Sequence, residues 1–389
     1  MEGKFIPLSV PNIRGNEIKY VTEALEAEWV STGGAMIDKF ESDIAQYVHS
    51  VGAVACQSGT AGLHLAMYYL GVGRGNLIIV PTLTFIAAVN PVRYLGAEPV
   101  FMDCDDSLCI DPVKLNEYLE NECDYIAGNV YDRESGKQIK AIIAVHIFGN
   151  MADMETIMAI AERYNLPVIE DATEALGSYY ISGKYKGKYA GTIGTIGVYS
   201  FNGNKIITTG GGGMMVSQSQ DILNKLRYYS TQAKDDAVNF IHHEIGFNYR
   251  MTNIQAAMGI AQLEKLDEFI KTKTLHYNYY KQEIDRMNGL ELLAYSSQIR
   301  SNYWFYAMVL DDSLYHKDEM MEYYTQHSIQ TRPIWGLISE QKPYVDFKAY
   351  KIEKAKYYFD RIVNIPCSTN LTMDDVERVI QATQQFVGE

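Results

Sequence analysis

The stretch Thr195-Ile-Gly-Val-Tyr-Ser-Phe-Asn-Gly-Asn-Lys205 joins an apolar, β-branched start to a polar turn that ends in lysine. The start, Thr195–Tyr199, lacks the polar alternation of a half-exposed strand and predicts a buried strand of a mostly parallel sheet. Similar runs occur earlier in the chain, at Val51–Ala55, Leu77–Val80, Pro99–Met102, Ala141–Val145 and Leu166–Ile169. Helix-length amphipathic segments lie between these runs, which indicates βαβ units and an open α/β sheet.

The texture of the chain changes near Lys273. Before it, strand-like and helix-like segments alternate, and the last of them, Asn253–Thr272, predicts one amphipathic helix. After it, charged and tyrosine-rich helices flank strand-like pieces such as Trp304–Val309. We expect a large domain over residues 1–270 and a smaller α+β domain over residues 271–389, packed closely because no Gly/Ser-rich linker separates them.

Composition excludes several classes of protein. The 389 residues include 48 acidic and 34 basic side chains, and the net charge of −14 argues against a general binder of nucleic acid or membrane surfaces. No stretch approaches the roughly 18 consecutive apolar residues of a membrane-spanning helix. The five cysteines form no CxxC pair, and Cys104 and Cys109 lack further ligands at metal-binding spacing, so we expect no metal. With no signal-peptide pattern in Met1–Pro7, a cytoplasmic protein with free thiols is expected.

Two segments place polar groups directly after predicted strands. Ser58-Gly-Thr-Ala61 opens a predicted helix over Thr60–Leu70, and such a turn offers free N–H groups and the positive end of the helix dipole to a phosphate. Ile169-Glu-Asp-Ala-Thr-Glu-Ala175 places acidic residues at the carboxyl end of a strand, where open α/β sheets bind ligands. Each segment could instead serve only to cap a helix.

A third segment adds a lysine and a glycine run. Lys205 lies in a turn after a predicted buried strand, and Gly210–Gly213 follows it. Consecutive glycines let the backbone approach a bulky or flat group. A partly desolvated lysine can form a Schiff base with an aldehyde, although a surface lysine in a glycine-rich hairpin is the simpler alternative.

Together the three segments supply what pyridoxal phosphate (PLP) requires. Lys205 would bond to the aldehyde, the helix N-terminus would take the phosphate, and an acidic residue would keep the ring nitrogen protonated. A protonated ring is an electron sink that stabilises negative charge on a neighbouring carbon. The combination is much more specific than any one segment.

In this order and spacing, the motifs resemble the DegT/DnrJ family of PLP-dependent sugar aminotransferases. The matching stretches are Ser58–Ala66, Val80–Ala87, Val145–Gly149, Ile169–Gly177, Ser200–Lys205 and Gly246–Ala257. The resemblance runs from about Ile6 to the C-terminus. It implies the aspartate aminotransferase-like fold (fold type I), with a large domain built on a mostly parallel sheet and a smaller C-terminal α+β domain.

The resemblance also implies the site. Lys205 and Asp171 are the implied catalytic residues, as the Schiff-base lysine and the partner of the pyridine nitrogen. Phe85 is implied to stack on the cofactor ring, and Asn248 to complete the phosphate site of a neighbouring subunit. The implied cofactor-binding residues are Gly59, Thr60, Ala61, Phe85, Asp171, Glu174, Ser200, Lys205 and Asn248. A homodimer with shared active sites follows from this resemblance.

Two positions depart from the family pattern. Many members have Glu where Gly211 stands, and Gln or His where Glu174 stands, near the 3′-oxygen of the cofactor. A glutamate there must be protonated or accept a hydrogen bond from a protonated oxygen, because two anions in contact repel each other.

The resemblance further implies the reaction. Gly203–Met214 and the opening Pro7–Asn12 look most like the branch that aminates nucleotide-linked 4-keto-6-deoxy sugars, on routes such as that to legionaminic acid, with L-glutamate as the implied donor. A branch that replaces the catalytic lysine by histidine performs dehydration, and Lys205 favours transamination over that alternative. A non-catalytic PLP-binding regulator is a second alternative. A nicotinamide-dependent oxidoreductase is disfavoured because Gly71–Gly75 ends a helix instead of opening one.

The candidate substrate-binding residues lie in two places in the sequence, after the Asp171 segment and in the C-terminal part. A nucleotide diphosphate needs local positive charge in a chain of net charge −14. Lys184, Tyr185 and Lys186 follow the Asp171 segment and could supply it, or could form an ordinary solvated loop. The resemblance adds Arg332 and Trp335 as lining residues.

Overall fold

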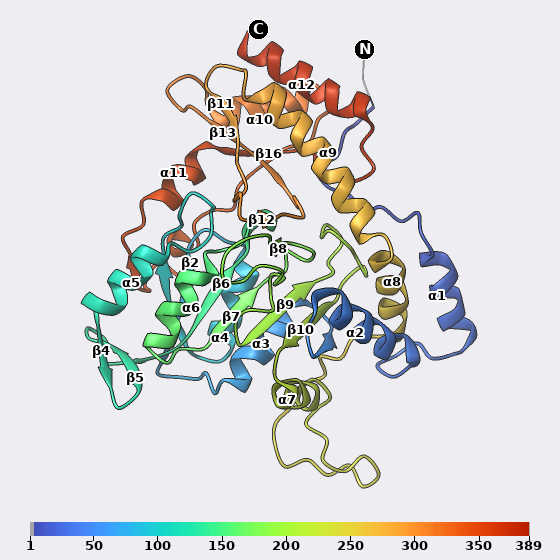
Figure 1. Cartoon of the computed structure of the whole chain (residues 1–389), viewed down its shortest axis with the longest axis vertical. Coiled ribbons are helices and arrows are strands. Elements are labelled where there is room, and N and C mark those ends of the chain that lie inside the picture. The colour runs from blue at the N-terminus through green and yellow to red at the C-terminus, as the bar shows by residue number, and fades with distance from the viewer. Residues whose placement is uncertain (1–3, 389) are drawn as a thin grey trace.

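A ten-stranded sheet forms the centre of the larger part of the molecule in the computed structural model, which describes residues 4–388 (Figure 1). Its strands are β1 (Gly52–Cys56), β2 (Asn76–Pro81), β3 (Glu98–Met102), β4 (Cys123–Ile126), β5 (Asn129–Asp132), β6 (Gln138–Val145), β7 (Val168–Asp171), β9 (Ile196–Ser200), β10 (Gly213–Ser217) and β15 (Ala349–Tyr350). The order is β1-β10-β9-β7-β6-β2-β3-β15, with β5 added to β6 and β4 to β5. From β9 to β15 every neighbouring pair along this path is parallel, whereas β10 is antiparallel to both of its neighbours. The predicted mostly parallel sheet is therefore confirmed.

Helices cover this sheet, and local sequence explains where they begin. They are α1 (Glu17–Glu26), α2 (Ala35–Val48), α3 (Gly59–Tyr69), α4 (Asn90–Tyr94), α5 (Pro112–Asn121), α6 (Met154–Arg163), α7 (Gln220–Ser230) and α8 (Asn253–Leu263), with short 3-10 turns at η1 (Ile86–Ala88) and η2 (Ile147–Gly149). Asp111 accepts hydrogen bonds from the first N–H groups of α5, and Pro112 occupies its first position, where no N–H is needed. Ser58 and Asp153 cap α3 and α6 in the same way.

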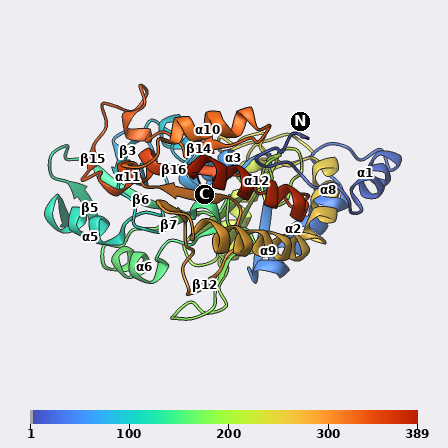
Figure 2. The ribbon, with the colours of Figure 1, turned by 90° about the horizontal axis from the view of Figure 1, so that it is seen from above.

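A four-stranded antiparallel sheet forms the smaller part. It consists of β11 (Leu290–Leu292), β13 (Tyr306–Leu310), β16 (Ile362–Ile365) and β14 (Arg332–Pro333), in that order. The helices of this part are α9 (Leu266–Ile284), α10 (Lys317–Gln326), α11 (Lys354–Arg361) and α12 (Met373–Val387), with a 3-10 turn at η3 (Ile338–Glu340). Figure 2, which views the molecule from this end, shows α9, α10 and α12 in front of the central sheet. A short antiparallel pair, β8 (Tyr179–Tyr180) with β12 (Ile299–Arg300), links the two parts.

The prediction of one helix over Asn253–Thr272 is wrong. Helix α8 ends at Leu263, and α9 begins at Leu266 and continues to Ile284. The break lets the chain change partners, because α8 packs against α1 and α2, whereas α9 packs against α12 and β11. Glu264, at the break, is held by hydrogen bonds from Asn16 and Tyr20.

Contacts cross between the two parts from both ends of the chain. Strand β15 leaves the C-terminal part to pair with β3. Asp103, just after β3, accepts hydrogen bonds from the N–H groups of residues 353–355 at the start of α11. Near the N-terminus, Ile6 bridges to Ile329 of the smaller part. The division into residues 1–270 and 271–389 stays a prediction, and it cuts across these contacts.

Within residues 4–388, no helix is both long and apolar enough to cross a membrane. The same residues contain no group of three or more His, Cys, Asp and Glu side chains placed to hold a metal ion. All the cysteines are buried and carry free thiols.

Candidate active site

A pocket opens at the carboxyl edge of the central sheet, where the loops after β1, β2, β6, β7 and β9 meet. Open α/β sheets bind ligands at this edge because loops from neighbouring parallel strands converge there. The smaller part closes the pocket with residues 304, 305 and 335. The lining residues are Ser58, Gly59, Thr60, Leu63, Thr84, Phe85, Ala87, Ala88, Val145, Asp171, Thr173, Glu174, Ser200, Asn202, Asn204, Lys205, Gly211, Gly212, Trp304, Phe305 and Trp335. Three segments that are far apart in the sequence therefore line one pocket.

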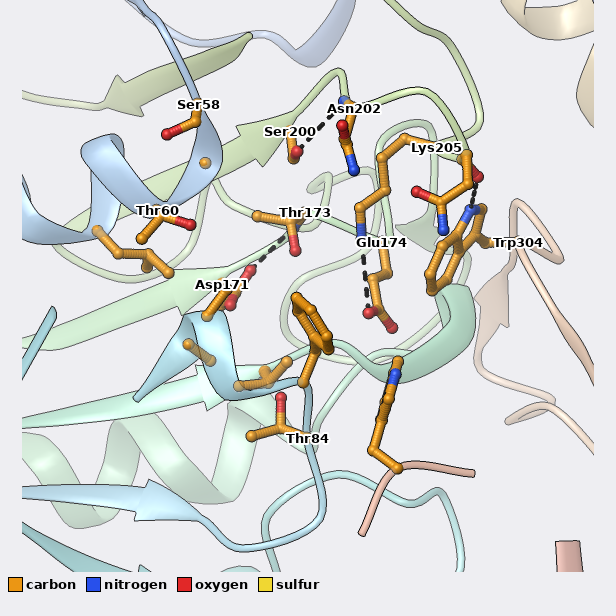
Figure 3. A pocket seen from close by; sticks show the side chains of 18 of the residues that line it. Ser58, Thr60, Thr84, Asp171, Thr173, Glu174, Ser200, Asn202, Lys205 and Trp304 are labelled. Atoms are coloured by element: carbon orange, nitrogen blue, oxygen red, sulfur yellow. Dashed lines mark hydrogen bonds and ion pairs between the residues drawn. The ribbon is translucent and has the colours of Figure 1, made fainter. Parts of the chain in front are cut away.

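Lys205 extends from the turn after β9 into this pocket. Its backbone N–H closes the turn on the carbonyl of Asn202 at 3.0 Å. Its Nζ lies 3.6 Å from Oε1 of Glu174 and 4.1 Å from the ring centroid of Trp304, and the side chain is 11% exposed. Figure 3 shows Lys205 pointing toward Glu174 with Trp304 beside it. The amine is thus enclosed and faces the site instead of solvent.

Asp171 is the last residue of β7, and its carboxylate lies in the pocket (Figure 3). It is 3% exposed, and its Oδ1 accepts the N–H of Thr173 at 3.1 Å. Burial raises the pKa of Asp171, while the hydrogen bonds from Thr173 and the charge of Lys205 act in the opposite direction. A buried carboxylate with so few partners favours a cationic hydrogen-bond donor in front of it.

Glu174 faces the same pocket from the next turn. Its Oε2 accepts the N–H of Phe148 at 2.9 Å, and its Oε1 pairs with Lys205. Burial raises the pKa of Glu174 to about 7, although the charge of Lys205 and the N–H of Phe148 oppose the rise. The carboxyl group therefore exchanges between its protonated and ionised forms near neutral pH.

Glu170, the first acid of the same segment, has a different role. Side chains alternate along a strand, so Glu170 points away from the face that Asp171 presents. It accepts hydrogen bonds from the backbone of Gly191 at 2.8 Å and Ile193 at 2.7 Å. It also accepts a hydrogen bond from Nε2–H of His146 at 2.9 Å, because Nδ1 of that ring accepts the N–H of Ala152. Glu170 thus fixes the loop before β9 and does not line the pocket.

The N-terminus of α3 forms an anion site beside these groups. Ser58 caps the helix by accepting the N–H of Ala61 at 3.0 Å, which leaves the N–H groups of Gly59 and Thr60 at the open end. A Cβ at Gly59 would lie 2.9 Å from Thr173 and 3.0 Å from Ser200, so only glycine admits these hydroxyl-bearing side chains so closely. Free N–H groups, a helix dipole and neighbouring hydroxyls fit a phosphate dianion.

The glycine run explains how β10 passes this site. A Cβ at Gly213 would lie 2.6–2.7 Å from backbone atoms of Ser58 and Gly59. The predicted close approach is therefore made to the backbone of the anion site itself. Gly211 and Gly212 line the pocket directly.

Aromatic rings form the remaining walls. Phe85, which follows β2, is 53% exposed, and its ring centroid lies 6.3 Å from that of Trp335. Trp335 in turn lies 5.0 Å from Phe148. A half-exposed phenyl ring at the pocket mouth offers a face on which a flat heterocycle can stack. Phe85 and Trp335, both singled out in the sequence, therefore lie next to each other in the lining of the pocket.

Several candidate residues lie away from this pocket in the same chain. Asn248 is exposed beyond α7 and accepts a hydrogen bond through its backbone carbonyl from Gln57. Lys184 and Lys186 are exposed on the loop after β8, where Nζ of Lys184 lies 5.2 Å above the ring of Tyr185. Arg332 is exposed on β14. Their roles toward substrate or a second subunit stay predictions.

The predicted site does not include two other lining residues, Trp304 and Phe305. Trp304 and Phe305 were expected to begin a strand, but β13 starts at Tyr306 and the two rings face the pocket. The aromatic density of Tyr303–Tyr306 is a signal, but it does not indicate that the segment folds back onto a lysine about a hundred residues earlier.

Comparison with known proteins agrees with this geometry. Residues 11–384 match the model of the DegT/DnrJ/EryC1/StrS aminotransferase family. The chain is 36% identical over 383 residues to "Putative pyridoxal phosphate-dependent aminotransferase EpsN" of Bacillus subtilis, covering 97% of this chain and 95% of that protein. It is 35% identical over 386 residues to GDP-perosamine synthase of Escherichia coli O157:H7, covering 99% and 100%. The crystal structure of the aminotransferase TlmJ from Streptoalloteichus hindustanus superposes with a TM-score of 0.88 at 25% identity, covering 98% of both chains.

Proposed function

The chain belongs to the DegT/DnrJ/EryC1/StrS aminotransferase family, and from this premise we propose that it moves an amino group from L-glutamate to a nucleotide-linked 4-keto-6-deoxy sugar. It is a sugar aminotransferase with PLP as its cofactor.

The pocket fits the cofactor on four separate counts. The open end of α3, with the hydroxyls of Thr60 and Ser200, would hold the phosphate, and Phe85 would stack on the ring. Asp171 would hold the proton of the ring nitrogen, and Lys205 would bond to the aldehyde. A buried carboxylate and an enclosed amine in one pocket are the observation that carries the proposal.

The residues of the chain then perform acid–base work. When bound, PLP supplies an electron sink for the negative charge left on a carbon that loses its proton. Nζ of Lys205, in its free amine form, accepts the proton from the amino-bearing carbon of the donor. It then delivers this proton to the carbon that is bonded to the other side of the donor's amino nitrogen. In the second half-reaction Lys205 moves the proton in reverse, onto the sugar carbon. Glu174, which faces Nζ at 3.6 Å, stabilises the ammonium form between these transfers.

The substrate's phosphates require positive charge from outside the pocket. Among the lining residues that the structure describes, Lys205 is the single cationic side chain, and the reaction occupies it. Residues at the rim, or of another subunit, must therefore neutralise a diphosphate. The exposed lysines 184 and 186 and Arg332 are the candidates, as the sequence suggests.

A homodimer with shared sites is part of the proposal. The loop after α7 projects from the body of the molecule (Figure 1) and exposes the apolar side chains of Val238, Phe240 and Ile245 by 73–83%. Asn248 lies at the end of the same loop, exposed and outside its own pocket. An exposed apolar loop next to a polar residue with no role in its own site favours contact with a second copy.

The function is tested by direct turnover. The purified protein is incubated with L-glutamate carrying an isotopic label on its amino group, and with a panel of nucleotide keto-sugars. Mass spectrometry should detect labelled amino sugar from a 4-keto-6-deoxy substrate and none with Lys205→Ala. Amination of a 3-keto sugar alone would contradict the proposed ring position, and absence of any labelled product would contradict the proposed substrate class.

The shared site is tested by subunit mixing. Lys205→Ala and Asn248→Ala are each assayed alone and then after exchange of subunits. If both are inactive alone, the mixed dimers should regain activity, because one of their two sites contains both native residues. Two results would contradict the sharing. One is an absence of recovered activity in mixtures in which mass measurement shows that subunits have exchanged, and the other is full activity of Asn248→Ala alone.

A further inference from the structure

A closed ring of contacts joins Lys205 to the segment that precedes β13. Nζ of Lys205 pairs with Glu174, and the other oxygen of Glu174 accepts the N–H of Phe148 at 2.9 Å. The carbonyl of Phe148 accepts the N–H of Trp304 at 3.0 Å. The ring of Trp304 closes the circuit, with its centroid 4.1 Å from Nζ (Figure 3).

Trp304 is fixed in this position by its own side chain. Its indole N–H donates to the carbonyl of Asn204, directly before the lysine, at 2.7 Å. Its ring stacks on Phe305, with centroids 4.1 Å apart and planes 5° from parallel, and Trp304 is only 3% exposed. The indole therefore touches the lysine at both ends, at the backbone of its turn and at its amino group.

The backbone of Trp304 is held by hydrogen bonds from the side of the residue that faces α9. The buried Lys273 of α9 donates from Nζ to the carbonyl of Trp304 at 2.9 Å and to that of Cys367 at 2.5 Å. No carboxylate pairs with Lys273 among the ion pairs of the described residues, so its donors serve backbone carbonyls. Asn302 adds hydrogen bonds from its amide to the carbonyls of Glu174 at 2.9 Å and Leu176 at 3.0 Å. The segment is thus tied to the same turn that carries Glu174.

This arrangement answers a requirement of the proposed reaction. A lysine that moves a proton must return its amino group to one place each time that the group is released, and four rotatable bonds oppose this. An aromatic face attracts an ammonium group without accepting its proton, unlike a carboxylate. A ring in this position therefore restrains the amino group while leaving it able to transfer a proton.

We propose that Trp304 is a positioning residue for the amino group of Lys205, held against it by the buried Lys273. The inference rests on the proposed function only for the identity of the reaction that Lys205 performs. Without the ring, the amino group would keep its partner Glu174 but lose the wall that confines it to the site. A core residue with no such role would affect stability and leave the reactivity of Lys205 unchanged.

The first test uses the protein without cofactor. A brief pulse of a small amine-reactive ester is followed by peptide mass spectrometry, and the labelling of Lys205 is divided by that of the exposed Lys184. We expect Trp304→Leu and Trp304→Met to raise this ratio about threefold to tenfold, the range of an aromatic–cation contact. Trp304→Phe keeps the ring face and should change it less than about twofold. Trp29→Phe, an exposed tryptophan elsewhere, is the matched control.

The role of Lys273 in holding the backbone of Trp304 is tested in the same assay with Lys273→Met. The control is Lys271→Met, which changes an exposed lysine of the same helix. The first should raise the labelling of Lys205 and the second should not. An unchanged ratio in folded Trp304→Leu and Trp304→Met would overturn the proposal. So would a uniform rise at all lysines, because that result would indicate general loosening of the structure.

The second test uses the reconstituted enzyme with L-glutamate deuterated at the carbon that loses its proton. For Trp304→Met we expect kcat to fall about tenfold, an undiminished isotope effect, and a donor KM within about twofold of the native value. A rise in KM with unchanged kcat would overturn the positioning role. If the wild-type protein aminates no sugar while the labelling pattern is as expected, the proposed function fails and the positioning role stands.

Discussion

Two lysine-bearing, glycine-containing turns lie within thirty residues of each other, and the fold uses them differently. Lys205 follows the central strand β9, and its side chain is 11% exposed. Lys184 and Lys186 follow β8, which pairs with β12 outside the central sheet, and both are exposed. The composition of the two turns is similar, so composition does not decide which lysine can do chemistry.

The difference comes from the neighbouring strand. Because β9 pairs in parallel with β7, the turn after β9 lies beside the end of β7 and the turn that follows it, where Asp171 and Glu174 are buried. The loop after β8 instead meets the surface of α6, where the backbone of Lys184 contacts Glu155. Lys205 therefore faces an enclosed carboxylate because two parallel strands end side by side at this edge of the sheet.

The largest effect is expected from removal of the amino group that the turn after β9 carries. Lys205→Ala removes the group that moves the proton, so kcat should fall by more than about a thousandfold. The same change in the exposed loop, Lys188→Ala, should leave kcat within about twofold, since a solvated lysine contributes little. Steady-state assays with both substrates measure the two variants. Comparable losses in both would mean that the turn after β9 is not special.

Asp171→Asn tests the acid that the neighbouring strand contributes. An amide of the same shape cannot hold the proton of a ring nitrogen, so we expect turnover to fall on the order of a hundredfold while the protein still folds and binds cofactor. Absorbance of the bound cofactor and the rate of the glutamate half-reaction measure the effect. Near-native turnover would place the partner of the ring nitrogen elsewhere.

Glu174 makes the buried turn sensitive to pH in a way that the exposed loop is not. Burial raises its pKa from the ordinary 4.5 to about 7, so the folded protein favours the protonated carboxyl group. The associated stabilisation is complete below pH 4.5 and is lost as the pH rises through 7. Glutamine mimics the protonated form at every pH.

In the cofactor-free protein, the unfolding free energy of the wild type should therefore fall relative to Glu174→Gln, by on the order of 3 kcal/mol between pH 5 and pH 8. Urea unfolding at a series of pH values measures the difference, with the exposed Glu26→Gln as control. A difference that stays flat with pH would show that Glu174 remains ionised throughout.

The sequence predicts the sheet and the core of the site because both depend on local patterns. The six apolar runs correspond to β1, β2, β3, β6, β7 and β9, and their ends differ by at most three residues. Parallel pairing then places Asp171 and Lys205 together without further information. Alternation along β7 also separates Asp171 from Glu170, although the sequence alone does not show which of the acids faces the pocket.

Contacts made over long sequence distances are what the sequence does not predict. Trp304 reaches Lys205 only because Asn302 and Lys273 tie its segment to a turn of the larger part. The helix break at Glu264 likewise depends on α1, more than two hundred residues earlier. No local pattern records either partner.

The smallest expected effect concerns the exposed loop after β8. Lys184→Ala with Lys186→Ala removes two solvated charges that lie outside the pocket of their own chain. Such charges act on a diphosphate through a screened field, so the KM for the nucleotide sugar should rise about twofold to fivefold at low salt and less at high salt. The glutamate half-reaction, which involves no diphosphate, should keep its rate in stopped-flow measurements. Equal loss in both half-reactions would make the loop structural, and an unchanged KM at low salt would assign the diphosphate to other cations, with Arg332 the next to test.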